Sequence, residues 1–224
     1  QLVRQQFDTS HAALYYPWFT IPDPMPANLA AVQDVAVPPS PYLLGLYARV
    51  DNARGVHKAP ANEVVNGIAG LTRYINQREH DILNPLNIDV TRDFRRDNRG
   101  IRVWGARTLS SDSQWRYINV RRLFIFVEAS IEQGLQYAVF EPNAEPLWAQ
   151  VRRSISNFLT TVWRNGALEG TSAEQAFFVR CDRTTMTQAD IDDGRLIAVV
   201  GMAPVKPAEF VVIRVMQKTL QADD

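Results

Sequence analysis

The chain has 224 residues, with 24 basic and 24 acidic side chains and 46% hydrophobic residues. This is enough apolar material for one large domain or two small ones. The zero formal net charge argues against a protein that coats nucleic acid or an anionic membrane, because those partners require uncompensated Lys and Arg. The single cysteine, Cys181, excludes an internal disulfide and a thiolate-rich metal site, since each needs at least two sulfurs.

The first segment, residues 1–40, is strand-like and then rich in proline. We expect an upstream part to precede it, because the chain starts at Gln1 and runs straight into strand-like sequence. The aromatic and β-branched run AALYYPWFTI at 12–21 predicts a strand, and the prolines that follow predict a stiff loop. The second segment, residues 41–224, starts with a predicted helix at 42–52, with Ser40 as N-cap and Pro41 at the first helical position.

The middle of the chain alternates short elements with loops. Residues 55–63 predict a surface loop, and 68–75 predict a short helical turn or strand. Residues 76–84 predict a short helix that Pro85 ends. The runs NIDVTRDF and GIRVWG predict two strands separated by the exposed loop RRDNRG.

Two long amphipathic helices are predicted in the second half. The first follows Asn119 as N-cap, and the second covers 144–164 and stops at Asn165-Gly166. Strands are predicted at 176–182, 195–203 and 209–219, with a short capped helix at 187–193 between the first two. Together these elements predict an α+β fold in which a mixed β-sheet is covered by the two long helices.

Motifs of enzymes are not found in the sequence. It contains no GxxxxGK[ST] phosphate loop, no GxGxxG, no HExxH and no GxSxG. The histidines His11, His57 and His80 fall in three different predicted elements, which favours structural roles over metal binding. Cys181 is interpreted as a buried structural thiol rather than a nucleophile. We therefore expect no catalytic residue, no cofactor and no metal, and a protein that is not an enzyme.

Two charge clusters have simple interpretations as well. Asp190, Asp192 and Asp193 lack the spacing of a calcium loop and are interpreted as a solvated helix end. Three arginines, Arg95, Arg96 and Arg99, could form a phosphate patch, but Asp93 and Asp97 lie in the same stretch. A surface or cross-subunit ion pair is the better interpretation.

Distinctive segments recur along almost the whole chain. The segment GIRVWGARTLS at 100–110 closely resembles the signature of the contractile tail sheath family of phage tails and related injection particles. Further segments resemble the same family in the same order: YYPWF at 15–19, VPPSPYLLGLYARVD at 37–51, RGVHKAPANE at 54–63, LNPLNI at 83–88, WRYINVRRL at 115–123, FEPN at 140–143, NGALEGTSAEQAFFVRCD at 165–182 and APVKPAEFVVIRVMQ at 203–217.

The resemblance implies a structural subunit that polymerises as stacked hexameric rings around an inner tube and contracts to drive the tube through a target envelope. Residues 41–224 would be its C-terminal assembly domain. The implied partners are further copies of the chain, the inner tube protein and the baseplate and terminator proteins, with no nucleic acid, membrane or cofactor. The implied location is a virion tail or contractile particle assembled in the bacterial cytoplasm.

In this family, terminal arms typically add strands to the sheets of neighbouring subunits. The candidate arm is the strand predicted near the C-terminal end of the chain. Both of its faces are largely apolar, and it must be covered, because an exposed strand edge of this kind would aggregate. A strand buried within its own subunit fits the sequence equally well, and the resemblance favours the intersubunit strand. Ala203-Pro204 and Pro207 form a plausible hinge before it. The candidate strand comprises Glu209, Phe210, Val211, Val212, Ile213, Arg214, Val215 and Met216.

The surface that faces the inner tube is expected to be polar and charge-complementary to the tube. The candidate residues lie on the helix at 144–164 and comprise Gln150, Arg152, Arg153 and Asn157. A solvated helix face is the alternative for these positions. For the whole chain the competing function is a non-enzymatic glycan- or peptide-binding domain. The five tryptophans are interleaved with aliphatic residues, which favours packing over an exposed binding platform.

Overall fold

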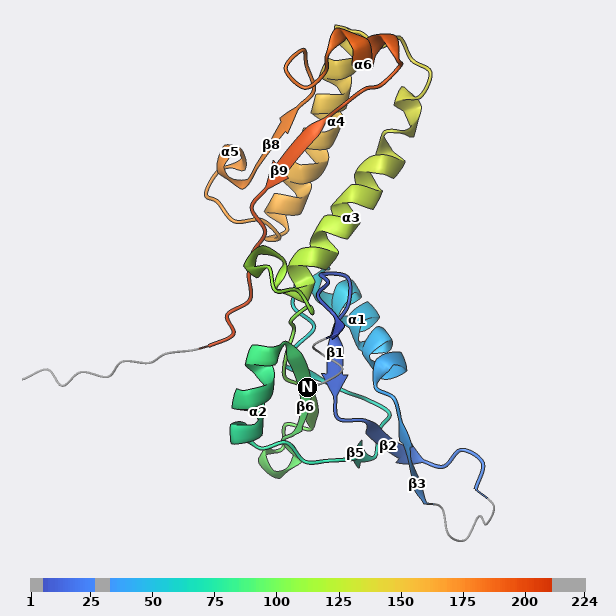
Figure 1. The fold of residues 1–224 in the computed structure, drawn as a ribbon, viewed down its shortest axis with the longest axis vertical. Helices are drawn as coiled ribbons and strands as arrows, with labels where there is room; N and C mark the ends of the chain where they lie inside the picture. The colour runs from blue at the N-terminus through green and yellow to red at the C-terminus, as the bar shows by residue number, and fades with distance from the viewer. Residues whose placement is uncertain (1–5, 27–32, 211–224) are drawn as a thin grey trace, which may run out of the picture.

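The computed structural model describes residues 6–26 and 33–210. The molecule is elongated and consists of two halves stacked along its long axis (Figure 1). The lower half comprises β1 (Leu14–Tyr16), β2 (Phe19–Pro22), β3 (Asp34–Val37), α1 (Ser40–Arg54), β4 (Glu63–Val64), β5 (Gly70–Leu71), α2 (Gln77–Leu83), β6 (Ile88–Asp93) and β7 (Ile101–Val103). The upper half comprises α3 (Ile118–Gly134), α4 (Glu145–Arg164), α5 (Ala173–Ala176), β8 (Phe177–Arg180), α6 (Gln188–Asp192) and β9 (Val199–Met202).

The lower half contains two small sheets. One has the order β1-β6-β7-β4, in which β1 runs parallel to β6 and the other neighbours are antiparallel. The other has the order β3-β2-β5 and is antiparallel. Phe19 of β2 is fully buried and shares a core with Leu43 and Leu46 of α1 and Val103 of β7. This core therefore joins the segments on both sides of residue 40.

The upper half has a separate core between the long helices and a two-stranded ribbon. Leu123 and Val127 of α3 and Val151 and Leu159 of α4 are buried there, as the helical spacing predicted. The predicted α+β class is confirmed, but the arrangement needs correction: α3 and α4 lie over the antiparallel pair β8–β9, and the mixed sheet belongs to the lower half. The strands are divided between the two halves because each half packs its strands and helices around its own hydrophobic core.

Helix boundaries follow local capping where a side chain supplies the cap. Asn76 and Thr187 form the caps that start α2 and α6, and the cap of α6 was predicted. Two predicted caps are wrong. Ser40 makes no capping hydrogen bond at the start of α1, and α3 begins at Ile118, which places Asn119 inside the helix. Within the described ranges, no helix is both long enough and apolar enough to cross a membrane.

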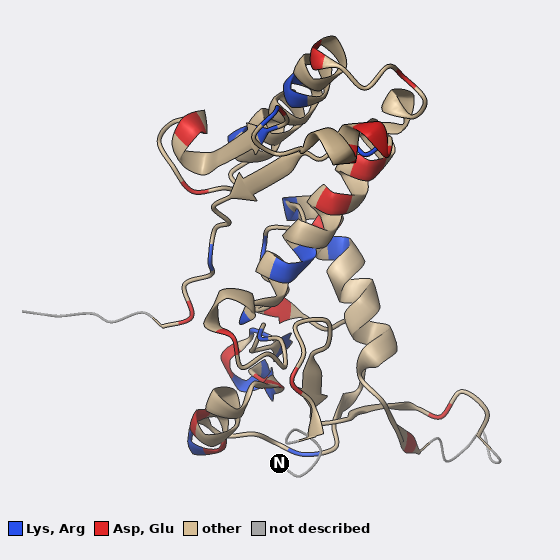
Figure 2. Ribbon diagram, turned by 45° about the horizontal axis from the view of Figure 1, so that its top comes forward, with Lys and Arg blue, Asp and Glu red and all other residues tan. Residues whose placement is uncertain are grey.

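Charged side chains of both signs occur in both halves (Figure 2). Among the tryptophans, Trp148 is buried at 1% exposure, whereas Trp18 is 51% exposed. Trp104, Trp115 and Trp163 are partly buried. The predicted packing role therefore holds for most of the five and fails for Trp18, because the short turn between β1 and β2 points it outward.

Candidate assembly site at the root of the C-terminal segment

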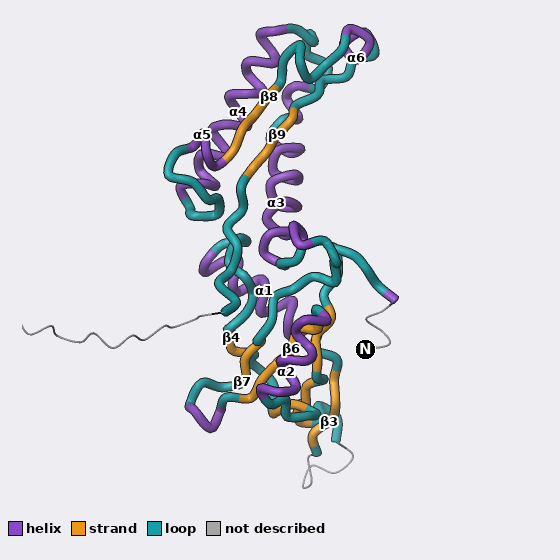
Figure 3. Tube along the Cα trace, turned by 60° about the vertical axis from the view of Figure 1, so that its left-hand side comes forward, coloured by secondary structure: helices purple, strands orange, loops and turns teal. Residues whose placement is uncertain are grey.

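The chain that follows β9 is tied to the rest of the molecule by backbone hydrogen bonds. The amide of Ala203 donates to the carbonyl of Ala176 at 2.9 Å, and the carbonyl of Ala203 accepts from the amide of Glu169 at 2.8 Å. Val205 donates to the carbonyl of Ala167 at 3.2 Å. Residues 203–210 then continue as a loop from the upper half to the lower half (Figure 3). We call residues 203–210 the root of the C-terminal segment.

Asn119 holds the middle of the root. Its side chain is 2% exposed, and its Nδ2 donates to the carbonyl of Val205 at 3.1 Å and to that of His57 at 2.9 Å. Asn119 was expected to cap a helix, but its position one residue into α3 lets it join three parts of the chain instead. Its contacts join residues 62 and 86 positions apart, so local sequence could not reveal them.

The end of the root is held by a salt bridge between Glu209 and Arg107. Arg107 Nε lies 2.8 Å from Glu209 Oε1, and Arg107 Nη2 lies 2.7 Å from Oε2. The two side chains are only 10% and 19% exposed. Asn84 Nδ2 donates to Oε1 at 2.9 Å, and the Tyr117 hydroxyl donates to Oε2 at 3.1 Å. Such a bidentate, charge-assisted arrangement is among the stronger polar contacts in proteins.

The electrostatics of this anchor favour an ionised Glu209. Burial raises the pKa of the Glu209 carboxyl, but the hydrogen bonds from Arg107, Asn84 and Tyr117 outweigh burial and hold the pKa below its ordinary value. Burial, together with the nearby negative charge of Glu209, raises the pKa of Tyr117. At neutral pH the anchor is therefore a carboxylate surrounded by donors.

The segment GIRVWGARTLS supplies the base of the anchor. The Arg107 amide donates to Asp89 Oδ1 at 2.8 Å, and Arg107 Nη1 donates to the carbonyl of Asn84 at 2.9 Å. Gly105 lies so close to Asp89 that a Cβ at this position would be 2.9 Å from the Asp89 Cα. Only glycine fits there without moving backbone. The side chain of Asp89 is fully buried, and burial raises its pKa well above the ordinary value.

Sequence reasoning missed this anchor because Arg107 and Glu209 are 102 positions apart. One signal was present: each is a charged residue inside a largely apolar stretch, and such residues are usually paired when buried. Of the predicted intersubunit strand, Glu209 contacts its own subunit and Phe210 is 71% exposed. Residues 211–216 lie outside the described residues, so the shared strand stays a prediction.

The predicted tube-facing residues do not all share one surface. Gln150, Arg153 and Asn157 are exposed and lie on one side of α4. Arg152 instead donates to the carbonyl of Cys181 and lies 3.5 Å from Glu145. Arg152 therefore stabilises its own subunit, and the role of the other three stays a prediction.

The histidines and the cysteine differ in their surroundings. His11 Nε2 lies 2.6 Å from Arg121 Nη2, and burial lowers the pKa of both His57 and His80. Cys181 is fully buried, and burial raises the pKa of its thiol, which makes it a poor nucleophile. In the part of the chain that the structure describes, no three His, Cys, Asp or Glu side chains are grouped to hold a metal.

Comparisons with known proteins agree with this architecture. The model of the phage tail sheath protein central domain matches residues 3–109, and that of the phage tail sheath C-terminal domain matches residues 110–218. The major tail sheath protein of Serratia phage KSP20 is 27% identical over 213 residues, covering 92% of this chain and 50% of that protein. The chain spans about half the length of the curated relatives it matches.

Solved structures give the same result. The sheath complex of the extracellular contractile injection system PVC in its contracted state has a TM-score of 0.86 at 39% identity, covering 97% of this chain and 59% of that one. The helical sheath of the anti-feeding prophage in its contracted state has a TM-score of 0.83 at 42% identity, covering 94% and 57%. With two sheath domain models that follow one another along the chain, this protein belongs to the contractile tail sheath family.

Proposed function

We propose that this chain is a structural subunit of a contractile sheath, which polymerises around an inner tube and contracts to drive the tube through a target envelope. The observation that carries the proposal is the succession of the central and C-terminal sheath domains along one chain. The work of contraction comes from the assembled lattice, in line with a sequence that carries no nucleotide-binding motif. Baseplate proteins and the tube protein are the further partners, and assembly takes place in the bacterial cytoplasm.

The β8–β9 ribbon is suited to receive a strand from a neighbouring subunit. It has only two strands, so among the described residues one edge of each strand has no strand neighbour. Phe178 and Val199 are 49% and 43% exposed on it. Phe178 covers Gly201 across the strand pair, and the Arg180 guanidinium lies 5.3 Å from the Phe178 ring centroid, so the exposed face of the ribbon is apolar with one positive charge. In the proposal, residues 210–218 of one subunit pair with this ribbon in the next subunit.

The root gives the added strand a fixed starting point. Asn119 holds Val205, and Arg107 holds Glu209, so the chain leaves the subunit at a defined place. Force on the added strand is therefore carried into the subunit at Arg107 and Asn119. This supports the segment after Glu209 as the link between subunits during contraction.

Truncation of the full protein tests the shared strand. Deleting residues 211–224 keeps the anchor at Glu209, and we expect a folded monomer that forms no sheath in negative-stain images. Deleting residues 219–224 alone leaves the proposed strand intact and should preserve assembly, which controls for nonspecific effects of truncation. Sheaths of normal length from the longer deletion would contradict the proposal.

The tube contact has a separate test. Arg153→Glu reverses an exposed charge on α4 and should reduce co-sedimentation of the sheath with the inner tube. Gln150→Ala and Asn157→Ala remove polar groups on the same side and should have smaller effects. Unchanged tube association in all three variants would exclude this side of α4 as the tube-facing surface.

A further inference from the structure

The hairpin that β6 and β7 form carries more positive charge than the chain neutralises. Residues 92–102 contain five arginines and two aspartates. Arg95 forms an ion pair with Asp93, with Nη2 2.6 Å from Oδ2. Within residues 6–26 and 33–210, none of the other four arginines forms an ion pair with a carboxylate. We call residues 92–102 the arginine hairpin. Asp93 and Asp97 were expected to neutralise the arginines, but they offset only part of the positive charge of the arginine hairpin.

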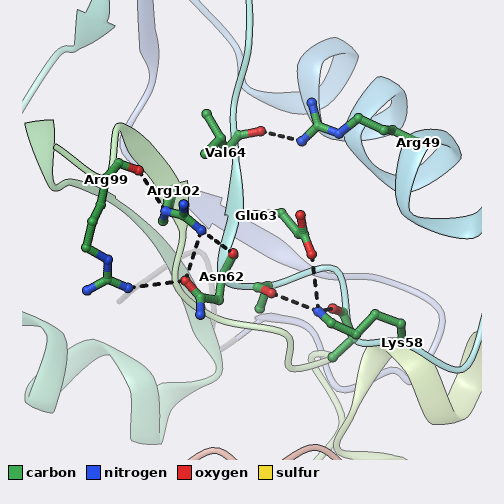
Figure 4. A network of polar contacts seen from close by, with 9 residues as sticks. Arg49, Lys58, Asn62, Glu63, Val64, Arg99 and Arg102 are labelled. Carbon is green, nitrogen blue, oxygen red and sulfur yellow. Dashed lines mark hydrogen bonds and ion pairs between the residues drawn. The ribbon is translucent and has the colours of Figure 1, made fainter. Parts of the chain in front are cut away.

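Contacts within the subunit hold three more of the guanidinium groups of this hairpin in place. The Arg99 guanidinium lies 4.9 Å from the Phe94 ring centroid and 5.4 Å from that of Trp104. Arg92 lies 5.0 Å from the Phe94 centroid. Arg102 donates to the carbonyls of Arg99 and Asn62, each at 2.7 Å (Figure 4). Stacked and hydrogen-bonded arginines lose little freedom on binding, which favours recognition of a carboxylate.

A hollow of about 340 Å³ lies beside the hairpin and is lined by Tyr74, Asp93, Arg95 and Arg96. Tyr74 is 60% exposed at its edge. An aromatic ring next to guanidinium groups can accept both an apolar side chain and a carboxylate. The surface therefore fits a partner that presents an acidic group beside an aromatic one.

The upper half of the same molecule presents acidic groups and an aromatic side chain. Between Arg122 and Arg152 there are four glutamates and no Lys or Arg. Glu128 and Glu132 are exposed four residues apart on α3, where two like charges destabilise a helix. Glu141 is exposed in the loop between α3 and α4, and this loop lies at the upper end of the molecule (Figure 1).

Phe140 directly precedes Glu141 in the loop after α3 and is the most exposed large hydrophobic residue that the structure describes, at 103%. Its backbone has a φ of 68°, a left-handed conformation that is unfavourable for a bulky side chain. The subunit gains no packing from this ring. Strained backbone that presents an exposed aromatic side chain is typical of a binding site. We call Glu128, Glu132, Phe140 and Glu141 the acidic tip.

We propose that the acidic tip of one copy of this chain docks on the arginine hairpin of a second copy. The two surfaces carry opposite charge, and the pairing of Phe140 with Glu141 matches the pairing of Tyr74 with Arg96. They lie in different halves of the molecule (Figure 1), so the contact is head-to-tail, and such contacts build rings or helical polymers. The inference rests on the proposed sheath function and adds a second contact, independent of the C-terminal strand.

A charge swap in the full protein tests this contact. Arg96→Glu with Arg99→Glu reverses the hairpin, and Glu128→Lys with Glu132→Lys reverses the tip. We expect each pair alone to lower the sedimentable fraction at least tenfold, and all four substitutions together to restore it to within about threefold of wild type, because the opposite charges face each other again. Arg78→Glu with Arg164→Glu reverses two exposed arginines outside both surfaces and should leave assembly unchanged.

The outcomes are distinct. Folded single-surface variants that assemble like wild type, as judged by circular dichroism and sedimentation, overturn the contact and leave the sheath function intact. Loss of assembly without recovery in the fourfold variant also overturns it. If only the hairpin reversal impairs assembly, the hairpin binds a different acidic partner and the assignment to a second copy is wrong. Wild-type protein that never polymerises overturns both proposals.

Discussion

The salt bridge between Glu209 and Arg107 allows a quantitative prediction. Glu209→Gln keeps the shape of the side chain but removes the charge that faces the Arg107 guanidinium, which is 10% exposed. Hydrogen bonds to charged groups each contribute about 1.5–3 kcal/mol, and Arg107 makes two to this carboxylate. Release of the root would let water reach Arg107, which limits the loss. We expect the free energy of unfolding to fall by about 2–3 kcal/mol.

For a chain of this size, such a change lowers Tm by about 4–12 °C. Urea unfolding of Glu209→Gln, Arg107→Met and the double variant forms a double-mutant cycle, with an expected coupling energy of about 2 kcal/mol. Hydrogen exchange of residues 203–210 should rise in both single variants. A coupling energy below about 0.5 kcal/mol, with exchange unchanged, would refute the assignment of Glu209 as the anchor.

The anchor also has a defined pH dependence. The folded-state pKa of Glu209 lies below its ordinary value of 4.5, so ionised Glu209 stabilises the folded state above that value. This stabilisation is lost as the pH falls through the lower, folded-state pKa. Glu209→Gln should remove the corresponding slope of stability against pH. An unchanged slope in the variant would assign the acid sensitivity to other carboxylates.

Three further predictions concern single contacts. Gly105→Ala should lower the free energy of unfolding by about 2 kcal/mol in urea titrations, since the added Cβ would approach the Asp89 backbone to 2.9 Å. Gly45→Ala is the control: this position has open space inside α1, so the free energy of unfolding should rise by about 0.5–1 kcal/mol. Asn119→Ala should cost about 2 kcal/mol, because two partly buried carbonyls lose a donor, and a loss under 0.5 kcal/mol would contradict its role. Gly201→Ala should destabilise the wild type more than the Phe178→Ala variant, measured by Tm, because the added Cβ lies 2.5 Å from Phe178 Cζ.

Local features of this fold could be predicted from sequence. The cap at Thr187 and the apolar spacing in α4 depend on residues a few positions apart, and each appears where expected. The same local reasoning failed at Asn119. An asparagine before an apolar run is typical of an N-cap, but here contacts with the distant Val205 and His57 determine its position.

The sheet arrangement and the anchor could not be predicted, because they depend on which strands share a core. The strand at 195–203 is reduced to β9, since only Val199–Met202 lies opposite β8. Nothing in either strand indicates that the pair would form a separate ribbon. For the candidate site, the sequence predicts a shared strand at 209–216, which stays a prediction, and it did not reveal the residues that hold the root.

These contacts change where motion between subunits is expected. The sequence suggested a hinge at Ala203-Pro204 and Pro207, yet Ala203 and Val205 are hydrogen-bonded to the upper half and Glu209 is bound by Arg107 in the lower half. A hinge needs backbone that can rotate without breaking such bonds. Rotation at residues 203–207 would break bonds in both halves, whereas rotation after Glu209 would break none of them. We therefore infer that the pivot of the C-terminal link begins at Phe210, and that force on the link is shared by both halves of the subunit.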